Sequence, residues 1–107
     1  MSENWFGVSP AAEFGPGART TIDVDGVPVL VLNVDGEIYA VEDFCTHDSL
    51  PLHDGSVEDG EIVCPFHGAR FCLKTGKNTA PPAFGDLPTM PVKVENGMIF
   101  VRDARWD

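Results

Sequence analysis

Three turn dipeptides in this sequence, Asp25-Gly26, Asp35-Gly36 and Asn96-Gly97, each separate two segments in which apolar and polar residues tend to alternate. The commonest two-residue β-hairpin turn needs a positive φ at its central residues, and Asp, Asn and Gly tolerate that conformation best. Alternation with a period of two is typical of a strand that buries one face. The dipeptides therefore predict antiparallel hairpins and a fold built mainly from short strands.

Strands are predicted on both sides of each turn and in two shorter places: 20–24, 27–34, 37–41, 61–63, 69–73, 91–95 and 98–101. No segment shows the pattern of a long amphipathic helix. A single helical turn is expected over 9–13, with Ser9 as its N-cap and Pro10 at its first helical position. Many short strands joined by frequent turns indicate an all-β fold, an antiparallel sandwich or barrel.

The length and charge of the chain exclude several classes of protein. Its 107 residues are enough for one domain and leave no room for a second sizeable core. The chain has 17 acidic and 7 basic side chains and a formal net charge of −10. Binding of nucleic acid, or of an anionic membrane surface, through a basic face is therefore not expected. No apolar stretch approaches the length of a transmembrane helix.

The cysteine count bears on the compartment. The three cysteines cannot all pair in disulfides, and the amino terminus shows no basic segment followed by an apolar one, as a secretory signal would. We therefore expect a cytoplasmic protein. In that reducing compartment cysteine binds a metal or a cluster more often than it forms a disulfide. A monomer in solution is also expected.

The chemistry of the chain is concentrated in two short motifs, Cys45-Thr46-His47 and Cys64-Pro65-Phe66-His67, which are separated by 16 residues. Each motif offers one thiolate and one imidazole from a single tight loop, so two facing loops can bind one centre between them. Zinc accepts two Cys and two His ligands, but its usual spacing groups Cys with Cys and His with His. A binuclear iron–sulfur cluster uses the mixture differently, with both Cys on one iron and both His on the other.

The pattern C-x-H…C-x-x-H resembles that of the Rieske-type ferredoxins, the small electron carriers of bacterial ring-hydroxylating dioxygenase systems. The resemblance extends over nearly the whole chain and includes the strand order, Gly68 after the second motif and a proline loop at Pro81-Pro82. It implies a Rieske-like antiparallel β-sandwich or barrel as a base, about residues 1–43 and 74–107. On this base it implies a small cluster-binding subdomain, about residues 44–73.

By the same resemblance, Cys45 and Cys64 would ligate one iron of a single Rieske [2Fe-2S] cluster, and His47 and His67 the other. The chain would be a one-electron carrier and not an enzyme. It would accept electrons from a flavin-dependent NAD(P)H reductase and pass them to a terminal Rieske oxygenase that hydroxylates an aromatic ring. Because His53 is the only other histidine, the chain lacks the two-His-one-carboxylate iron site that the oxygenase itself would need.

Two other classes of protein fit the same motifs. One is the Rieske small subunit of an assimilatory nitrite reductase, which would purify in a stable stoichiometric complex. The other is a zinc-binding structural module, which would be colourless, whereas an iron–sulfur protein is brown.

The resemblance also allows the reduction potential to be predicted. Respiratory and photosynthetic Rieske proteins carry an extra Cys in each loop, where this chain has Leu50 and Phe66, and hydroxyl residues where it has Ala69 and Phe71. Those hydroxyls donate hydrogen bonds to sulfur, and fewer donors stabilise the reduced cluster less. We therefore expect a potential at the low end of the Rieske range, about −150 mV.

The remaining unusual side chains are expected to have structural roles. We expect His53 to be a loop residue that binds no metal, with a role as a proton acceptor or as a contact to a partner protein as the alternative. Cys72 is expected to be a small buried strand residue, with an indirect role behind the cluster ligands or a redox role as the alternative. Aromatic residues are expected to pack in the core of the subdomain or against the base: Phe44, Phe66, Phe71, Trp5 and Trp106. For Phe44, Phe66 and Phe71 the alternative is that they shape solvent access to the cluster.

The acidic residues are unevenly distributed. Between Arg19 and Arg70 the sequence holds eleven Asp and Glu and no Lys or Arg, and the acidic stretch runs from residue 23 to residue 61. A solvated acidic surface is one interpretation. A docking face for a basic patch on a redox partner is the other, because transient redox partners rely on electrostatic steering.

Overall fold

The computed structural model describes residues 4–44, 51–65, 68–80 and 85–103. Within these ranges every paired strand is antiparallel, and the only helix is one 3-10 turn, η1 (Ala11–Glu13). The strands are β1 (Trp5–Pro10), β2 (Arg19–Val24), β3 (Val27–Val34), β4 (Glu37–Glu42), β5 (Val57–Glu58), β6 (Glu61–Val63), β7 (Arg70–Cys72), β8 (Asn78–Ala80), β9 (Val92–Glu95) and β10 (Met98–Arg102). The predicted all-β fold class is confirmed.

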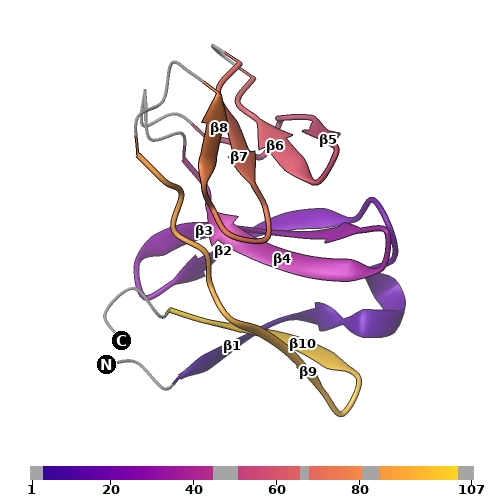
Figure 1. Ribbon diagram of the computed structural model, residues 1–107. Coiled ribbons are helices and arrows are strands. Elements are labelled where there is room, and N and C mark those ends of the chain that lie inside the picture. The colour runs from indigo at the N-terminus through magenta and orange to yellow at the C-terminus, as the bar shows by residue number, and fades with distance from the viewer. Residues whose placement is uncertain (1–3, 45–50, 66–67, 81–84, 104–107) are drawn as a thin grey trace.

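The strands form three sheets that are stacked in layers (Figure 1). The sheet β2–β3–β4 lies in the middle, with the sheet β1–β10–β9 on one side of it. The small sheet β5–β6–β7–β8 stands on the other side. Two hydrophobic cores fill the spaces between these layers.

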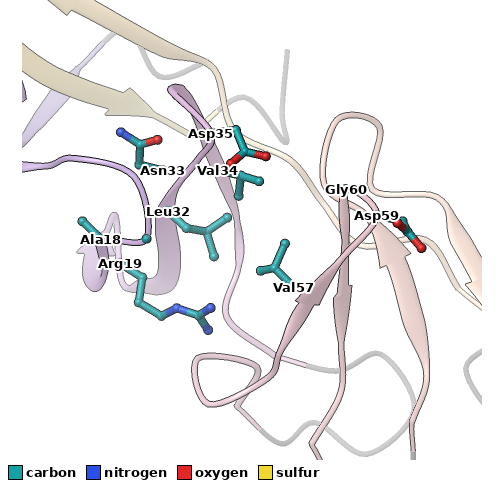
Figure 2. Close-up of a pocket in the computed structure, with 10 residues that line it drawn as sticks. Ala18, Arg19, Leu32, Asn33, Val34, Asp35, Val57, Asp59 and Gly60 are labelled. Atoms are coloured by element: carbon teal, nitrogen blue, oxygen red, sulfur yellow. The ribbon is translucent and has the colours of Figure 1, made fainter.

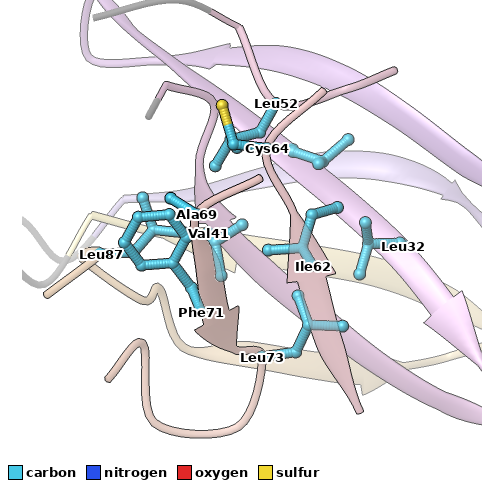
Figure 3. Packing of buried hydrophobic residues seen from close by; sticks show 10 residues of the cluster. Leu32, Val41, Leu52, Ile62, Cys64, Ala69, Phe71, Leu73 and Leu87 are labelled. Carbon is cyan, nitrogen blue, oxygen red and sulfur yellow. The ribbon is translucent and has the colours of Figure 1, made fainter. Parts of the chain in front are cut away.

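Strand β3 is buried on both faces, which explains its nearly continuous run of apolar residues. Consecutive strand residues point to opposite faces of a sheet. Val29 and Val31 therefore belong to the core shared with the sheet β1–β10–β9, whereas Leu30 and Leu32 belong to the core shared with the small sheet. Figure 3 shows this second core, in which Leu32 lies near Ile62.

The three predicted turn dipeptides each connect two strands with a positive φ at both residues, as expected: Asp25 and Gly26 (52° and 85°), Asp35 and Gly36 (53° and 97°), Asn96 and Gly97 (52° and 76°). A fourth turn of the same kind, Asp59-Gly60, joins β5 to β6 with φ values of 52° and 77°. The sequence contained this signal, but β5 has only two residues, too few to show an alternating pattern.

The helical turn lies where it was expected, but its predicted cap is wrong. Ser9 belongs to β1, where it pairs with Ile99, and its hydroxyl donates to the carbonyl of Pro10. The 3-10 turn begins after Pro10 and has no side-chain cap. Strand β1 itself was not predicted, because it contains Gly7 and ends at a proline, a combination that edge strands tolerate. No helix among the described residues is long and apolar enough to cross a membrane.

The small sheet extends beyond the predicted subdomain. Its last strand, β8 (Asn78–Ala80), pairs with β7, although the prediction assigned residues 74–107 to the base. The division into base and subdomain remains a prediction, and this pairing favours a subdomain that continues to about residue 80.

Candidate metal centre

Cys64 is the one predicted ligand that lies among the described residues. It follows β6 directly, its exposed fraction is 1%, and it forms no disulfide. Its side chain belongs to the core of the small sheet, and its sulfur lies at the end of that core beside Leu52 (Figure 3). A reduced thiol is thus held away from water at the end of the small sheet from which the second motif emerges.

Backbone hydrogen bonds close the second motif into a short loop. The N–H of Cys64 donates to the carbonyl of Ala69 (2.7 Å), and the N–H of Gly68 donates to the carbonyl of Cys64 (3.1 Å). Gly68 has a φ of +78°, a conformation in which glycine is favoured. His67 lies outside the described residues. On either side of it the chain leaves β6 and enters β7 at positions that pair with each other, Val63 and Arg70. A single tight loop that carries two ligands requires this arrangement.

The first motif lies outside the described residues, at 45–50, but both of its flanks are described. On the near side, Asp43 follows β4, and its N–H donates to the carbonyl of Pro28 on β3 (2.8 Å). On the far side, the N–H of Leu52 donates to Oδ1 of Asp43 (2.8 Å). Leu52 is fully buried in the same core as Cys64, so the return of the first loop meets the start of the second.

The described residues fit an iron–sulfur centre at this end of the small sheet. The buried thiol of Cys64 is a soft ligand of the kind that iron–sulfur clusters take. Its apolar neighbours, including Ala69 and Leu52, keep water from the inner side of the site, and such a shell tunes the potential of a bound metal.

Residues near the motifs partly confirm the predictions. Phe71 is fully buried in the core of the small sheet, as expected. Cys72 lies in strand β7, as expected, but it is only half-buried, because its side chain is on the face of the sheet opposite Phe71. A hydrogen bond from Thr75 to its sulfur lowers the pKa of the Cys72 thiol. Trp5 packs against the base beneath Lys93, whose Nζ lies 4.5 Å from the ring centroid.

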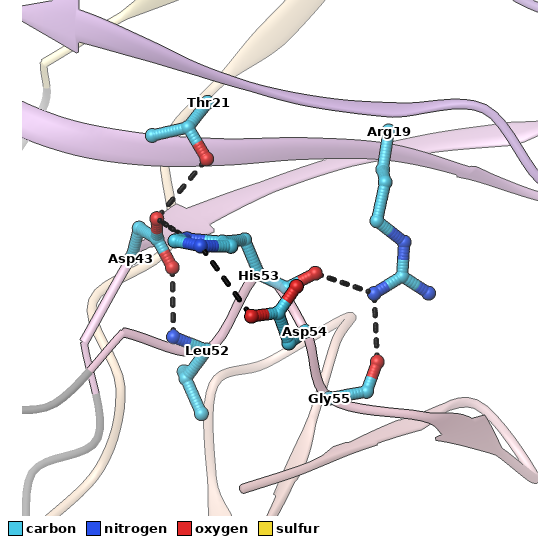
Figure 4. A network of polar contacts seen from close by, with 7 residues as sticks. All are labelled: Arg19, Thr21, Asp43, Leu52, His53, Asp54 and Gly55. Atoms are coloured by element: carbon cyan, nitrogen blue, oxygen red, sulfur yellow. Dashed lines mark hydrogen bonds and ion pairs between the residues drawn. The ribbon is translucent and has the colours of Figure 1, made fainter. Parts of the chain in front are cut away.

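His53 is a loop residue, as predicted, but it has a specific partner that the sequence did not reveal. Its Nδ1 lies 2.8 Å from Oδ2 of Asp43, and the same oxygen accepts a hydrogen bond from the hydroxyl of Thr21 (3.0 Å; Figure 4). Sequence reasoning counted Asp43 among the acidic surface residues, but its exposed fraction is 5%. Only the fold brings Thr21, Asp43 and His53 together.

The structure distributes the acidic stretch over several places. Asp35 and Asp59 lie in the β3–β4 and β5–β6 turns, and both line a cleft of about 400 Å³ where the small sheet meets the middle sheet (Figure 2). Glu58 and Glu61 form ion pairs with Arg70 (3.5 and 2.8 Å). Strand β6 runs from the β5–β6 turn, which contains Asp59, to Cys64. This turn and the second motif therefore lie at opposite ends of the small sheet.

Comparison with known proteins decides the family. The family model of the Rieske [2Fe-2S] domain matches residues 4–91. The chain belongs to the Rieske [2Fe-2S] domain family. As a member of this family it carries one Rieske [2Fe-2S] cluster.

Relatives within the Rieske family match this chain over most of its length. The ferredoxin component of the naphthalene 1,2-dioxygenase/salicylate 5-hydroxylase systems of Ralstonia sp. is 35% identical over 95% of this chain and 98% of its own. The 3-phenylpropionate/cinnamic acid dioxygenase ferredoxin subunit of Escherichia coli (strain K12) is 44% identical over 86% of this chain and 87% of its own.

A solved structure of a Rieske protein shows the same fold. It is the complex of reduced oxygenase and oxidized ferredoxin in carbazole 1,9a-dioxygenase. One of its chains is 33% identical to this chain, with a TM-score of 0.85 and coverage of 92% of each.

Proposed function

We propose that this chain is the ferredoxin of a multicomponent aromatic-ring dioxygenase. It takes one electron at a time from a flavin-dependent NAD(P)H reductase and passes it to a terminal Rieske oxygenase. The observation that carries the proposal is the likeness, over nearly the whole chain, to ferredoxin components of three such systems. The same likeness favours this role over that of a nitrite reductase subunit. The three systems act on different aromatic compounds, so the substrate is not carried over.

Within this proposal Cys45 and Cys64 hold one iron, and His47 and His67 hold the other. When bound, the cluster supplies a one-electron couple. The protein's part is to bind the cluster and to keep water from its inner side, where Cys64 and Leu52 are buried. Replacement of Cys64 by Ser should abolish the electron paramagnetic resonance signal of the dithionite-reduced protein. Cys72→Ser is the matched control, because Cys72 is the other described cysteine and has no proposed ligand role.

The function is tested by electron delivery. Holoprotein mixed with NADH, a flavin-dependent ferredoxin reductase and the oxygenase of carbazole 1,9a-dioxygenase should support product formation that depends on this chain. The Cys64→Ser variant should not support it. The proposal would be contradicted if the chain purified in a stable stoichiometric complex with a nitrite reductase and delivered no electrons to any ring-hydroxylating oxygenase.

We also propose that the partners dock at the end of the molecule that carries the ligand loops, and that acidic residues there steer them. Asp54 supports this proposal, because its side chain is 85% exposed and it follows the return of the first loop. Asp59 is the matched control at the opposite end of the small sheet. Asp54→Asn should slow the second-order rate of electron transfer at low salt more than Asp59→Asn. Equal effects, or a rate that does not change with salt, would refute this docking site.

Two further predictions belong to the same proposal. We propose that the chain acts as a monomer and in the cytoplasm. The net charge of −10 supports the first, because like-charged copies repel one another. Sedimentation equilibrium of the holoprotein should give the mass of one chain, and cell fractionation should recover the protein with the cytoplasmic fraction.

A further inference from the structure

The carboxylate of Asp43 is a buried charge with three hydrogen-bond donors. Its side chain is 3% exposed. Oδ1 accepts from the N–H of Leu52 (2.8 Å), and Oδ2 accepts from the hydroxyl of Thr21 (3.0 Å) and faces Nδ1 of His53 at 2.8 Å. A buried carboxylate is tolerated when its lone pairs are satisfied in this way. None of these contacts is to a residue next to Asp43 in the sequence.

The partners of Asp43 come from two different parts of the fold. Thr21 belongs to β2 of the middle sheet, whereas Leu52 and His53 form the segment by which the chain returns from the first motif (Figure 4). Because Asp43 itself precedes that motif, its carboxylate joins the two ends of the first ligand loop and fastens both to the middle sheet. Arg19 adds a second support, since its Nη1 donates to the carbonyls of His53 (3.0 Å) and Gly55 (2.7 Å).

The same return segment lies against the second ligand loop. The Leu52 side chain packs in the core that contains Cys64 (Figure 3). Three residues later, Gly55 approaches the backbone so closely that an added Cβ would clash with the carbonyl of Val63, the residue before Cys64. A shift of Leu52 away from Asp43 would therefore be transmitted to Cys64 through packed atoms.

We propose that Asp43 is a positioning residue of the cluster: its carboxylate closes the first ligand loop and, through Leu52, sets that loop against Cys64. The inference rests on the proposed function, because it takes Cys45 and His47 as ligands. Asp43 acts through the backbone of residues 52 and 53 and does not itself bind iron. Hydrogen-bonded groups behind metal ligands fix the orientation of those ligands, and their loss typically weakens metal binding by roughly 10- to 100-fold.

Two substitutions separate the hydrogen-bonding role of Asp43 from its charge. In Asp43→Ala both oxygens are lost. In Asp43→Asn the amide oxygen still accepts from Leu52, and the amide nitrogen can donate to the hydroxyl oxygen of Thr21. The control is Asn33→Ala, which removes another buried side chain that bonds two backbone groups, the carbonyl of Phe14 and the N–H of Gly36. Asn33 lies at the opposite end of the β3–β4 hairpin from Asp43.

Holoprotein of each variant is compared by its resonance spectrum, its potential and its rate of iron loss to a chelator. We expect Asp43→Ala to shift the g values and to lose iron roughly 10- to 100-fold faster than wild type. Asp43→Asn should restore the wild-type g values and a rate of iron loss close to that of wild type. Asn33→Ala should lower thermal stability but should neither shift the g values nor speed the loss of iron. The inference is overturned if Asp43→Ala keeps the wild-type g values and loses iron no faster than Asn33→Ala.

A measurement on the wild type covers the case in which Asp43→Ala does not fold. Hydrogen exchange of peptides that span residues 51–56 should show the Leu52 amide protected as strongly as the amides of β3. Exchange at the rate of an open loop would overturn the inference. Failure of the proposed function has a different signature, because the wild type itself would then lack a Rieske spectrum or fail to deliver electrons to an oxygenase.

Discussion

The imidazole of His53 bridges two carboxylates of very different exposure. Its Nδ1 lies 2.8 Å from Oδ2 of Asp43, which is 3% exposed, and its Nε2 lies 3.8 Å from Oδ2 of Asp54, which is 85% exposed. The hydrogen bond to Asp43 and the charge of that carboxylate raise the pKa of His53 above its ordinary value. Because the imidazole is 44% exposed, solvent screens part of this interaction.

The first prediction is that the His53–Asp43 contact stabilises the fold most at low pH. A histidine whose folded-state pKa is raised adds stability that is fully present below its unfolded pKa of about 6.5 and disappears as the pH rises through the folded-state pKa. The thermal midpoint of the wild type minus that of His53→Gln, measured from about pH 5 to about pH 9, should therefore be largest at the acid end.

The control for this prediction is Asp54→Asn, which removes the weaker, solvated partner of His53 and should leave most of the pH dependence in place. If the thermal midpoint of the wild type minus that of His53→Gln grows as the pH rises, the predicted direction of the pH dependence is wrong.

The second prediction concerns Gly55, a buried glycine without room for a side chain. A Cβ at this position would clash with the carbonyl of Val63 and would lie 3.0 Å from the carbonyl of Leu52. Overpacking of this kind typically costs about 1–3 kcal/mol, so Gly55→Ala should lower the thermal midpoint and the iron content of the purified protein. In Gly15→Ala, the control, an added Cβ meets nothing within 4 Å. Iron content in Gly55→Ala equal to that in the control would contradict the prediction.

The third prediction concerns stability in acid. The carboxylate of Glu61 on β6 accepts hydrogen bonds from Thr79 on β8 and from Arg70 on β7, and these bonds lower its pKa from the ordinary value of 4.5. Such a group adds stability that is present above about pH 4.5 and is lost as the pH falls through the lower folded-state pKa. The thermal midpoint of the wild type should therefore exceed that of Glu61→Gln near neutral pH and approach it in acid.

Glu58→Gln is the matched control for Glu61, because Glu58 is 55% exposed and lies 3.5 Å from Arg70. Its effect should be smaller at every pH. Both carboxylates are paired with Arg70. Equal effects of the two substitutions would therefore indicate that the stability comes from pairing with the charge of Arg70, and not from the hydrogen bonds that tie Glu61 to β7 and β8.

Local signals explain which parts of the fold were predictable. Asp25-Gly26 and Asp35-Gly36 carry their own backbone preference, so both hairpins, with nearly all of their strand bounds, followed from the sequence. Strands β5 and β8 have two and three residues and owe their existence to the neighbours with which they pair. No local pattern reports such pairing, so β8 was not predicted as a strand, and its pairing with β7 could not inform the predicted division into base and subdomain.

The candidate site, too, was predictable only where its signal is local in the sequence. Ligand spacing is a local property, so the two motifs could be recognised directly and the family confirms the cluster that they imply. The four ligands remain a prediction, of which the structure describes Cys64 alone. Asp43, by contrast, is one of many acidic residues in the sequence, and composition places it on the surface. Its buried carboxylate contacts Thr21 and His53, which lie 22 and 10 residues away along the chain, beyond the reach of any local pattern.

The last prediction concerns the reduction potential. Ala69 and Phe71 are fully buried beside the second motif and offer no hydroxyl, so the wild-type potential is expected to be about −150 mV. Ala69→Ser adds one donor close to Cys64 and should raise the potential, as measured by protein-film voltammetry. Ala40→Ser is the control, because Ala40 is equally small and 3% exposed but belongs to the other core. It should lower thermal stability and leave the potential unchanged. A wild-type potential near that of the high-potential Rieske proteins, about +300 mV, or an equal shift in both variants would show that missing hydroxyl donors do not set the potential.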